Sequence, residues 1–153
     1  MVGCPHDPSN SRPALDVEKE EIKVNQCFIG SCTNGRMEDL RMASNILEGN
    51  KVHKDVRLIV SPASMEIWKK ALQEGIFDIL TEAEALVCHP TCGPCSGLHM
   101  GILAAGERCI STTNRNFKGR MGSSDSEVYL ANSATVAATA IEGKIVDPRK
   151  YWT

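Results

Sequence analysis

Three cysteines are spaced so that their thiols could hold a soft metal centre. Cys32 lies in a loop that directly follows one apolar run, and Cys92 and Cys95 form a Cys-Gly-Pro-Cys pair in a loop after a second run. A third apolar run, 108–112, is followed by a polar loop, 114–120, that carries two arginines. In an open α/β sheet, ligands bind outside the carboxyl ends of the strands. The sequence therefore predicts one site that holds a soft metal centre and an anionic ligand together.

The Cys-Gly-Pro-Cys pair alone leaves several kinds of site open. Two thiolates at this spacing can chelate one metal, bind an iron–sulfur cluster or form a redox disulfide. A thioredoxin-like redox pair would follow an early strand, whereas this pair comes late in the chain. A structural zinc site would need a fourth ligand, for which the candidates are Cys88, His89 and His99. A cluster with three cysteine ligands would leave one iron open as a Lewis acid.

Length and composition exclude several classes of protein. The 153 residues favour one domain, and the 42% hydrophobic content is enough for a core. A net charge of −2 without a long basic run gives no indication of nucleic-acid binding. No apolar stretch approaches the roughly 20 residues of a membrane span, and the polar, proline-rich segment 1–11 has no apolar signal region. We therefore expect a cytosolic protein that does not bind a membrane. Its seven cysteines, an odd number, cannot all pair in internal disulfides.

Apolar runs alternate with helical patterns along most of the chain, which predicts an α/β fold. The expected strands are 24–30, 56–60, 85–88 and 108–112, and the expected helices are 36–48, 64–73, 76–83 and 133–141. The residues 124–127 match a capping box and predict the start of a helix at 128–130. This order indicates three layers, in which a mainly parallel sheet has helices on both faces. Residues 1–21 read as an irregular lead-in or linker, and residues 22–153 as the domain.

Three motifs, in order, resemble the aconitase superfamily. They are Gly30-Ser-Cys-Thr-Asn-Gly-Arg-Met-Glu-Asp-Leu-Arg41, Thr91-Cys-Gly-Pro-Cys95 and Ser111-Thr-Thr-Asn-Arg-Asn-Phe-Lys-Gly-Arg120. The ending, 127–138, is more similar to the large subunit of 3-isopropylmalate dehydratase or homoaconitase. The resemblance runs from about Val2 to Tyr151 and covers only the third, cluster-associated domain of such large subunits.

The resemblance implies a [4Fe-4S] cluster held by Cys32, Cys92 and Cys95. It also implies that Asn114, Arg115 and Arg120 bind substrate, and guanidinium forks suit carboxylates because they donate two parallel hydrogen bonds. The implied enzyme is a hydro-lyase that isomerises a hydroxy di- or tricarboxylate by dehydration and rehydration. The implied partners are two upstream domains and a small, swivelling subunit. Because those parts would supply acid–base groups, no residue of this chain is assigned as catalytic.

Other interpretations of the same residues stand beside this one. We expect Cys27, Cys88 and Cys109 to be core thiols and His89 and His99 to have structural roles. Thr33 and Asn34 are candidates to cap the helix that follows them, and Glu38 and Asp39 read as first-turn acids favoured by its dipole. A component of homoaconitase or aconitase is one functional alternative. A non-catalytic iron–sulfur or metal-binding module is the other.

Overall fold

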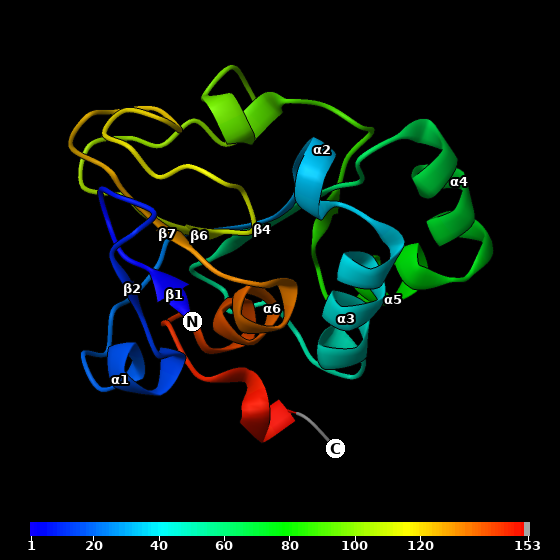
Figure 1. Ribbon diagram of the computed structural model, residues 1–153. Helices are drawn as coiled ribbons and strands as arrows, with labels where there is room; N and C mark the ends of the chain where they lie inside the picture. Colours follow the sequence, from blue (N-terminus) through cyan, green and yellow to red (C-terminus); the bar gives the residue numbers. More distant parts are fainter. Residues whose placement is uncertain (152–153) are drawn as a thin grey trace.

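A mainly parallel sheet of seven strands forms the middle of the molecule (Figure 1). The computed structural model describes residues 1–151. The strand order is β2-β1-β7-β6-β3-β4-β5, and the five strands β3 to β7 run parallel to one another. The carboxyl ends of these five strands therefore meet at one edge. The strands are β1 Val2–Gly3, β2 Ser11–Arg12, β3 Gln26–Gly30, β4 Arg57–Ser61, β5 Leu86–Val87, β6 Arg108–Ser111 and β7 Glu127–Leu130.

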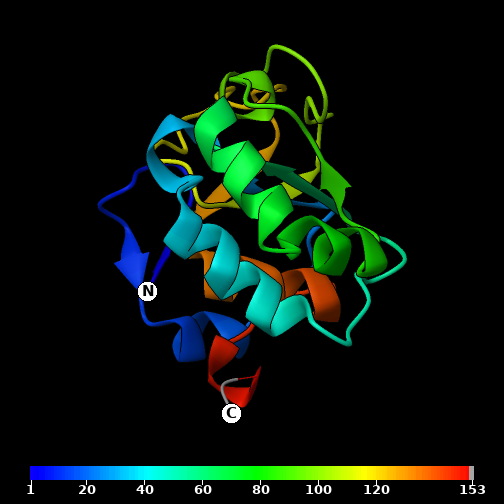
Figure 2. The same ribbon diagram turned by 90° about the vertical axis from the view of Figure 1, so that its right-hand side faces the viewer.

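Helices cover one face of this sheet, as Figures 1 and 2 show. The helix α3 buries Met37, Leu40, Ala43 and Leu47, whose spacing of three and four residues predicted it. It packs closely on α6, because α6 is rich in alanine and threonine and buries all of its residues 133–140. The helices are α1 Ala14–Glu18, α2 Ser31–Asn34, α3 Met37–Leu47, α4 Met65–Gln73, α5 Ile76–Glu82 and α6 Ser133–Glu142.

The opposite face is covered by the long connections that follow β5 and β6. Phe28, Ile59 and Cys109 point from the strands into this second core, where Leu103 and Met121 of the connections pack on them. A turn of 3-10 helix, η1 Gly93–Ser96, lies in this layer, and a second, η2 Pro148–Tyr151, ends the described chain. The prediction of a three-layer α/β domain is thus confirmed, with loops and η1 forming most of the third layer.

The segment 1–21 is ordered, unlike the irregular lead-in that the sequence predicted. It contains β1, β2 and α1, and Val2 and Val17 are fully buried. The strand β1 pairs antiparallel with β7 through Gly3 and Leu130. The prolines misled the prediction because they lie between the elements: Pro13 is the N-cap of α1, a position that needs no backbone N–H donor.

Residues 127–130 form the strand β7 and not the start of a helix. In the expected capping box, the carboxylate of Glu127 would reach back to Ser124, but it instead accepts a hydrogen bond from Nε of Arg108 on β6 (2.6 Å). The side chains of Val128 and Tyr129 are buried, and such β-branched and aromatic residues favour a strand between two paired neighbours. Tertiary pairing with β6 and β1 therefore overrides the local capping pattern.

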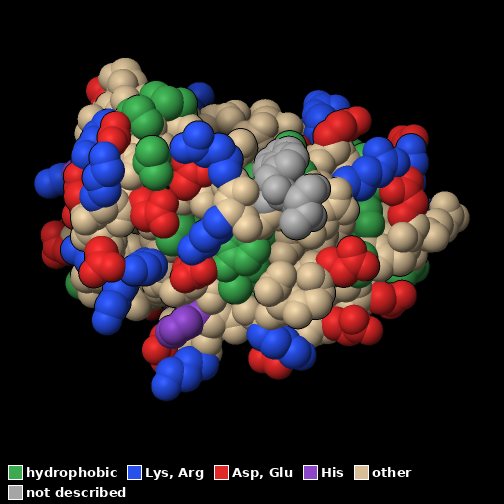
Figure 3. Space-filling model, turned by 90° about the horizontal axis from the view of Figure 1, so that it is seen from below, with side chains coloured by type: hydrophobic (Ala, Val, Ile, Leu, Met, Phe, Trp, Pro, Cys, Tyr) green, Lys and Arg blue, Asp and Glu red, His purple; other side chains and the backbone are tan. Residues whose placement is uncertain are grey.

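The surface seen in Figure 3 mixes charges of both signs. Lysine and arginine side chains alternate with aspartate and glutamate across this face, so it offers no continuous basic patch. Within residues 1–151, no helix combines the length and the apolar composition needed to cross a membrane.

Candidate functional site

The three predicted cluster cysteines lie above the carboxyl edge of the sheet. Cys32 is in α2, directly after β3, whereas Cys92 precedes η1 and Cys95 lies within it. Figure 1 shows α2 and η1 above this same edge. All three thiols are free; Cys32 and Cys92 are exposed and Cys95 is half-buried. Within the described part of the chain, however, no three Cys, His, Asp or Glu side chains are grouped closely enough to hold a metal ion.

The turn that presents Cys32 depends on Gly30. Gly30 has a φ of 144°, and a Cβ atom there would lie 2.1 Å from the carbonyl oxygen of Ser61. Only glycine tolerates both this φ and this close approach. Ser31, the next residue, also has a positive φ of 80°. The chain therefore leaves β3 abruptly and passes over the end of β4, and Cys32 comes to the surface.

The end of β4 holds the segment that leads to Cys92. Ser61 is fully buried, and its hydroxyl accepts a hydrogen bond from the backbone N–H of Thr91 (3.2 Å). The same hydroxyl oxygen lies 3.3 Å from the carbonyl oxygen of His89, to which it can donate. Because β4 lies between β3 and β5, Ser61 at its end has Gly30 of β3 on one side and the segment before Cys92 on the other. Ser61 therefore connects the two thiol segments. Sequence reasoning did not identify Ser61, since a serine at a strand end carries no distinctive pattern.

Two histidines near the Cys-Gly-Pro-Cys pair have structural partners. The ring of His89 stacks on Trp68 with 5.0 Å between centroids. The ring nitrogen Nε2 of His99 lies 3.1 Å from the hydroxyl of Thr91, which also accepts the N–H of Gly93. These contacts agree with the structural roles expected for both histidines.

The polar loop after β6, residues 114–120, is joined to the Cys32 turn by a set of hydrogen bonds, and we call it the arginine loop. Asn34 Nδ2 donates to the carbonyl of Thr112 and to Asn114 Oδ1 (3.0 Å). In return, Asn114 Nδ2 donates to the hydroxyl of Thr33 (3.0 Å). The expectation that Thr33 and Asn34 cap the next helix was therefore wrong: the N-cap of α3 is Arg36, whose N–H donates to the carboxylate of Asp39 (3.1 Å).

The two arginines of this loop differ in their surroundings. Arg115 is exposed. Arg120 is half-buried, and its Nη2 lies 3.9 Å from Cys95 Sγ, while its Nε is buried with no partner among the described residues. The loop is anchored by Asn116, which is fully buried and donates from Nδ2 to the carbonyl of Cys4 (2.9 Å). Sequence reasoning missed Asn116 because its partner is over a hundred residues away.

The remaining four thiols belong to the core. Cys27 and Cys109 are fully buried, and Cys4 and Cys88 nearly so. Burial raises the pKa of Cys27 well above its ordinary value and that of Cys109 to about 12, because a thiolate would lose its hydration. The expectation that Cys27, Cys88 and Cys109 are core residues is confirmed.

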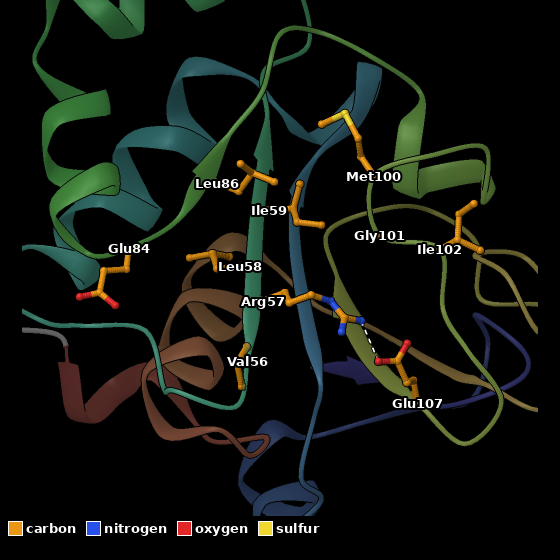
Figure 4. A pocket seen from close by; sticks show the side chains of 10 residues that line it. All are labelled: Val56, Arg57, Leu58, Ile59, Glu84, Leu86, Met100, Gly101, Ile102 and Glu107. Carbon is orange, nitrogen blue, oxygen red and sulfur yellow. Dashed lines mark hydrogen bonds and ion pairs between the residues drawn. The ribbon is translucent and has the colours of Figure 1, made fainter.

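Two pockets lie on different parts of the sheet. One of about 470 Å³ at the carboxyl edge is lined partly by Asn34, Thr112 and Asn132, so it borders the hydrogen bonds just described. Another, of about 600 Å³, lies over β4 and β5 (Figure 4). Arg57, which lines this pocket, donates from its guanidinium group to Glu107 (2.8 Å) and to Gln26 (3.2 Å). This side chain is therefore not free to bind a carboxylate in the pocket.

Comparison with known proteins gives a consistent result. Residues 8–143 match the model of the aconitase family (aconitate hydratase). The chain is 59% identical over 151 residues to 3-isopropylmalate dehydratase large subunit 1 of Methanopyrus kandleri, covering 99% of this chain and 36% of that protein. It is 57% identical over 150 residues to the 3-isopropylmalate dehydratase large subunit of Wolinella succinogenes, with 98% and 36% covered. The corresponding subunit of Acetivibrio thermocellus is 58% identical over 147 residues, with 96% and 35% covered.

The chain thus spans about a third of the length of the curated relatives it matches. The family model, in contrast, covers most of the chain, and the match includes all three motifs of the cysteine and arginine loops. This chain belongs to the aconitase family.

Proposed function

We propose that this chain is the iron–sulfur domain of a hydro-lyase that isomerises a hydroxy di- or tricarboxylate by dehydration and rehydration. The proposed enzyme is 3-isopropylmalate dehydratase, which acts in leucine biosynthesis, and the chain corresponds to part of its large subunit. One observation carries the proposal: two thiol loops and an arginine loop are hydrogen-bonded together at one sheet edge. The chain that holds them is 57–59% identical to subunits of that name.

The chemistry of the donor set fits a [4Fe-4S] cluster held by Cys32, Cys92 and Cys95. These three thiols are free and reach the surface or lie near it, whereas the other four are buried in the core. Next to Cys95, the buried Nε of Arg120 has no partner within residues 1–151 and could donate to a sulfur atom. A bound cluster with three protein thiolates would supply one Lewis-acidic iron for a substrate oxygen.

In this proposal, Arg115 and Arg120 bind the substrate carboxylates. A guanidinium can donate two parallel hydrogen bonds to a carboxylate, which fixes the orientation of the acid as well as its position. Asn114 holds the arginine loop against the Cys32 turn, and its Oδ1 can accept a further hydrogen bond. The base that removes the proton from the neighbouring carbon would come from a part of the enzyme outside this chain.

The proposed partners follow from the length of the relatives. Because the chain covers about 36% of a large subunit, further domains accompany this one in those proteins. We propose that such domains and a separate small subunit complete the site and exclude water, and that the whole assembly is cytosolic. The substrate could also be that of homoaconitase or aconitase, because groups that select the side chain would lie largely on the partners.

Anaerobic reconstitution tests the cluster directly. The chain is incubated with iron and sulfide, and its iron and acid-labile sulfide are measured together with its visible absorption. We expect four of each per chain, and mild oxidation should then remove one iron and produce the paramagnetic three-iron form. A chain that binds one zinc ion and no sulfide would contradict the proposal.

A non-catalytic iron–sulfur module remains the second candidate. The free thiols of Cys32, Cys92 and Cys95 would suffice for it, because such a module needs cluster ligands and no acid–base group. Reconstituted chain is combined with the complementary regions and small subunit of a relative, and hydration of the unsaturated acid is followed by absorbance. Turnover supports the hydro-lyase, whereas an intact cluster without turnover in that complete assembly supports the module.

A further inference from the structure

Three side chains bind the Cys32 turn to the loop that follows β6. Asn34 donates to Asn114, and Asn114 donates back to Thr33; we name this set of three residues the carboxamide latch. Asn34 also donates to the backbone carbonyl of Thr112. The carboxamides of Asn34 and Asn114 therefore each form hydrogen bonds to the other's segment, although some 80 residues separate them in sequence.

The latch matters because α2 cannot hold its own position. It has only four residues, and a helix of one turn has no stability of its own in water. Its backbone is attached at its two ends: Gly30 exchanges hydrogen bonds with the hydroxyl of Thr112 (2.9 and 3.2 Å), and the carbonyl of Gly35 accepts the N–H of Ala63 (2.9 Å). Between these ends, the side chains of Thr33 and Asn34 make its bonds to the arginine loop, and Cys32 lies between Gly30 and these side-chain bonds.

We propose that Asn34 is a positioning residue that sets Cys32 and the arginine loop in one fixed relation. A carboxamide suits this role because its two N–H donors can serve Thr112 and Asn114 at once. Because Asn34 bonds to Asn114, a shift of the Cys32 turn also shifts the arginine loop. The inference rests on the proposed function, since it assigns Cys32 as a ligand and Arg115 and Arg120 as substrate-binding residues.

The first test is made on the metal-free chain and does not need a cluster. In a ¹H–¹⁵N spectrum, Asn34→Ala should shift the side-chain NH₂ resonances of Asn114 and the backbone resonances of 31–35. Asn25→Ala is a matched control, because Asn25 also forms a side-chain hydrogen bond to a distant backbone group, the N–H of Arg108 (2.9 Å), but at the opposite sheet end. An unchanged Asn114 signal in Asn34→Ala, or the same shift in both variants, overturns the latch.

The second test asks whether the latch positions a cluster ligand. After reconstitution, Asn34→Ala should lose its cluster in air about three to ten times faster than the wild type, the range expected from one or two lost hydrogen bonds. Its three-iron form should also give an altered electron paramagnetic resonance line shape, which a loss of stability alone would not produce. Asn25→Ala should match the wild type in both.

The outcomes separate the latch from the proposed function. If the wild type binds a cluster and Asn34→Ala has the same lifetime and line shape, the positioning role is wrong and the proposed function stands. If the wild type binds no cluster at all, the proposed function is wrong, and the spectrum of the metal-free chain alone decides whether the latch exists.

Discussion

The guanidinium of Arg120 contacts the thiol of Cys95. The two atoms, Nη2 and Sγ, lie 3.9 Å apart, although the residues belong to connections that follow different strands. The contact joins a candidate substrate-binding residue to a candidate cluster ligand, so the loop after β6 lies against the Cys-Gly-Pro-Cys segment.

Arg120→Lys should weaken catalysis while leaving the cluster in place. An ammonium cannot reproduce the two-pronged geometry of the guanidinium, so kcat/KM of the complete assembly should fall about 10- to 100-fold, as for the loss of a hydrogen bond to a charged group. Rates and cluster absorbance are measured on the same sample. Lys118→Arg serves as the control, because Lys118 is exposed on the same loop. Unchanged turnover with an intact cluster would remove Arg120 from the active site.

Five of the seven thiols should divide into two classes when the metal-free chain is alkylated under native conditions. Cys32 and Cys92 should react first and the half-buried Cys95 more slowly, because access limits the reaction. Cys27 and Cys109 should react only after unfolding, since burial keeps them protonated as well as inaccessible. Peptide mass spectrometry identifies each modified site. Fast modification of Cys27 or Cys109 in the native chain would disprove this division.

Substitution of the same thiols should separate ligands from core residues. Cys32→Ser, Cys92→Ser and Cys95→Ser should abolish stable cluster incorporation without unfolding the chain. Cys27→Ala and Cys109→Ala should instead reduce the free energy of unfolding by about 1 kcal/mol through a small cavity and retain the cluster. Iron content and urea denaturation are measured for all five variants. Equal cluster loss in all of them would show that the ligand assignment is not selective.

Gly30→Ala should be one of the most destabilising single changes in the chain. Its Cβ would overlap the carbonyl oxygen of Ser61 at 2.1 Å, and its φ of 144° is unfavourable for any other residue. We expect a loss of about 3 kcal/mol or more in the free energy of unfolding. Gly49→Ala provides the comparison, because Gly49 has a φ of 73° but no neighbour within 4 Å, and it should cost about 1–2 kcal/mol. Equal losses would mean that the close contact has no energetic effect.

Glu142 should make part of the stability depend on pH. Hydrogen bonds from Lys150 (2.7 Å) and Tyr151 (2.6 Å) lower the pKa of this carboxyl. Its contribution is therefore fully present above the ordinary value near 4.5 and is lost as the pH falls through the lower, folded-state pKa. Glu142→Gln should cost about 0.5 kcal/mol at pH 7 and almost nothing near pH 2, because the pair is partly exposed. Urea denaturation at both pH values, with Glu48→Gln as a control, measures the difference.

The sequence predicted best those elements whose side chains repeat with a clear period. The helix around Leu40 and the strands around Phe28 and Ile59 were found because their apolar residues follow periods of 3.6 or form short buried runs. Strand β7 was missed because its local pattern favours a helix and only its neighbours in the sheet decide otherwise. The strands β1 and β2, with two residues each, are too short to show any period.

The sequence likewise predicted one part of the candidate site, its thiols, and missed another, the hydrogen bonds that hold its loops. The types and spacing of Cys32, Cys92 and Cys95 predicted which loops carry the thiols of the site, and parallel topology brings those loops to one edge. The hydrogen bonds that hold the loops were not predicted, because those of Ser61 and Asn34 to these loops span about 30 to 80 residues. Such contacts depend on the packed sheet and leave no trace in local sequence patterns.

The unequal strands beneath the three thiols imply an order in which the edge comes apart. Cys32 follows a five-residue strand in the middle of the sheet, whereas Cys92 and Cys95 follow a strand of only two residues at its border. Local opening in proteins begins where few buried contacts and hydrogen bonds resist it. The Cys-Gly-Pro-Cys segment should therefore fray together, on a faster timescale, while Cys32 stays in place. A metal centre bound to all three cysteines would first lose its bonds to Cys92 and Cys95. It could then be rebuilt on Cys32, which stays in place.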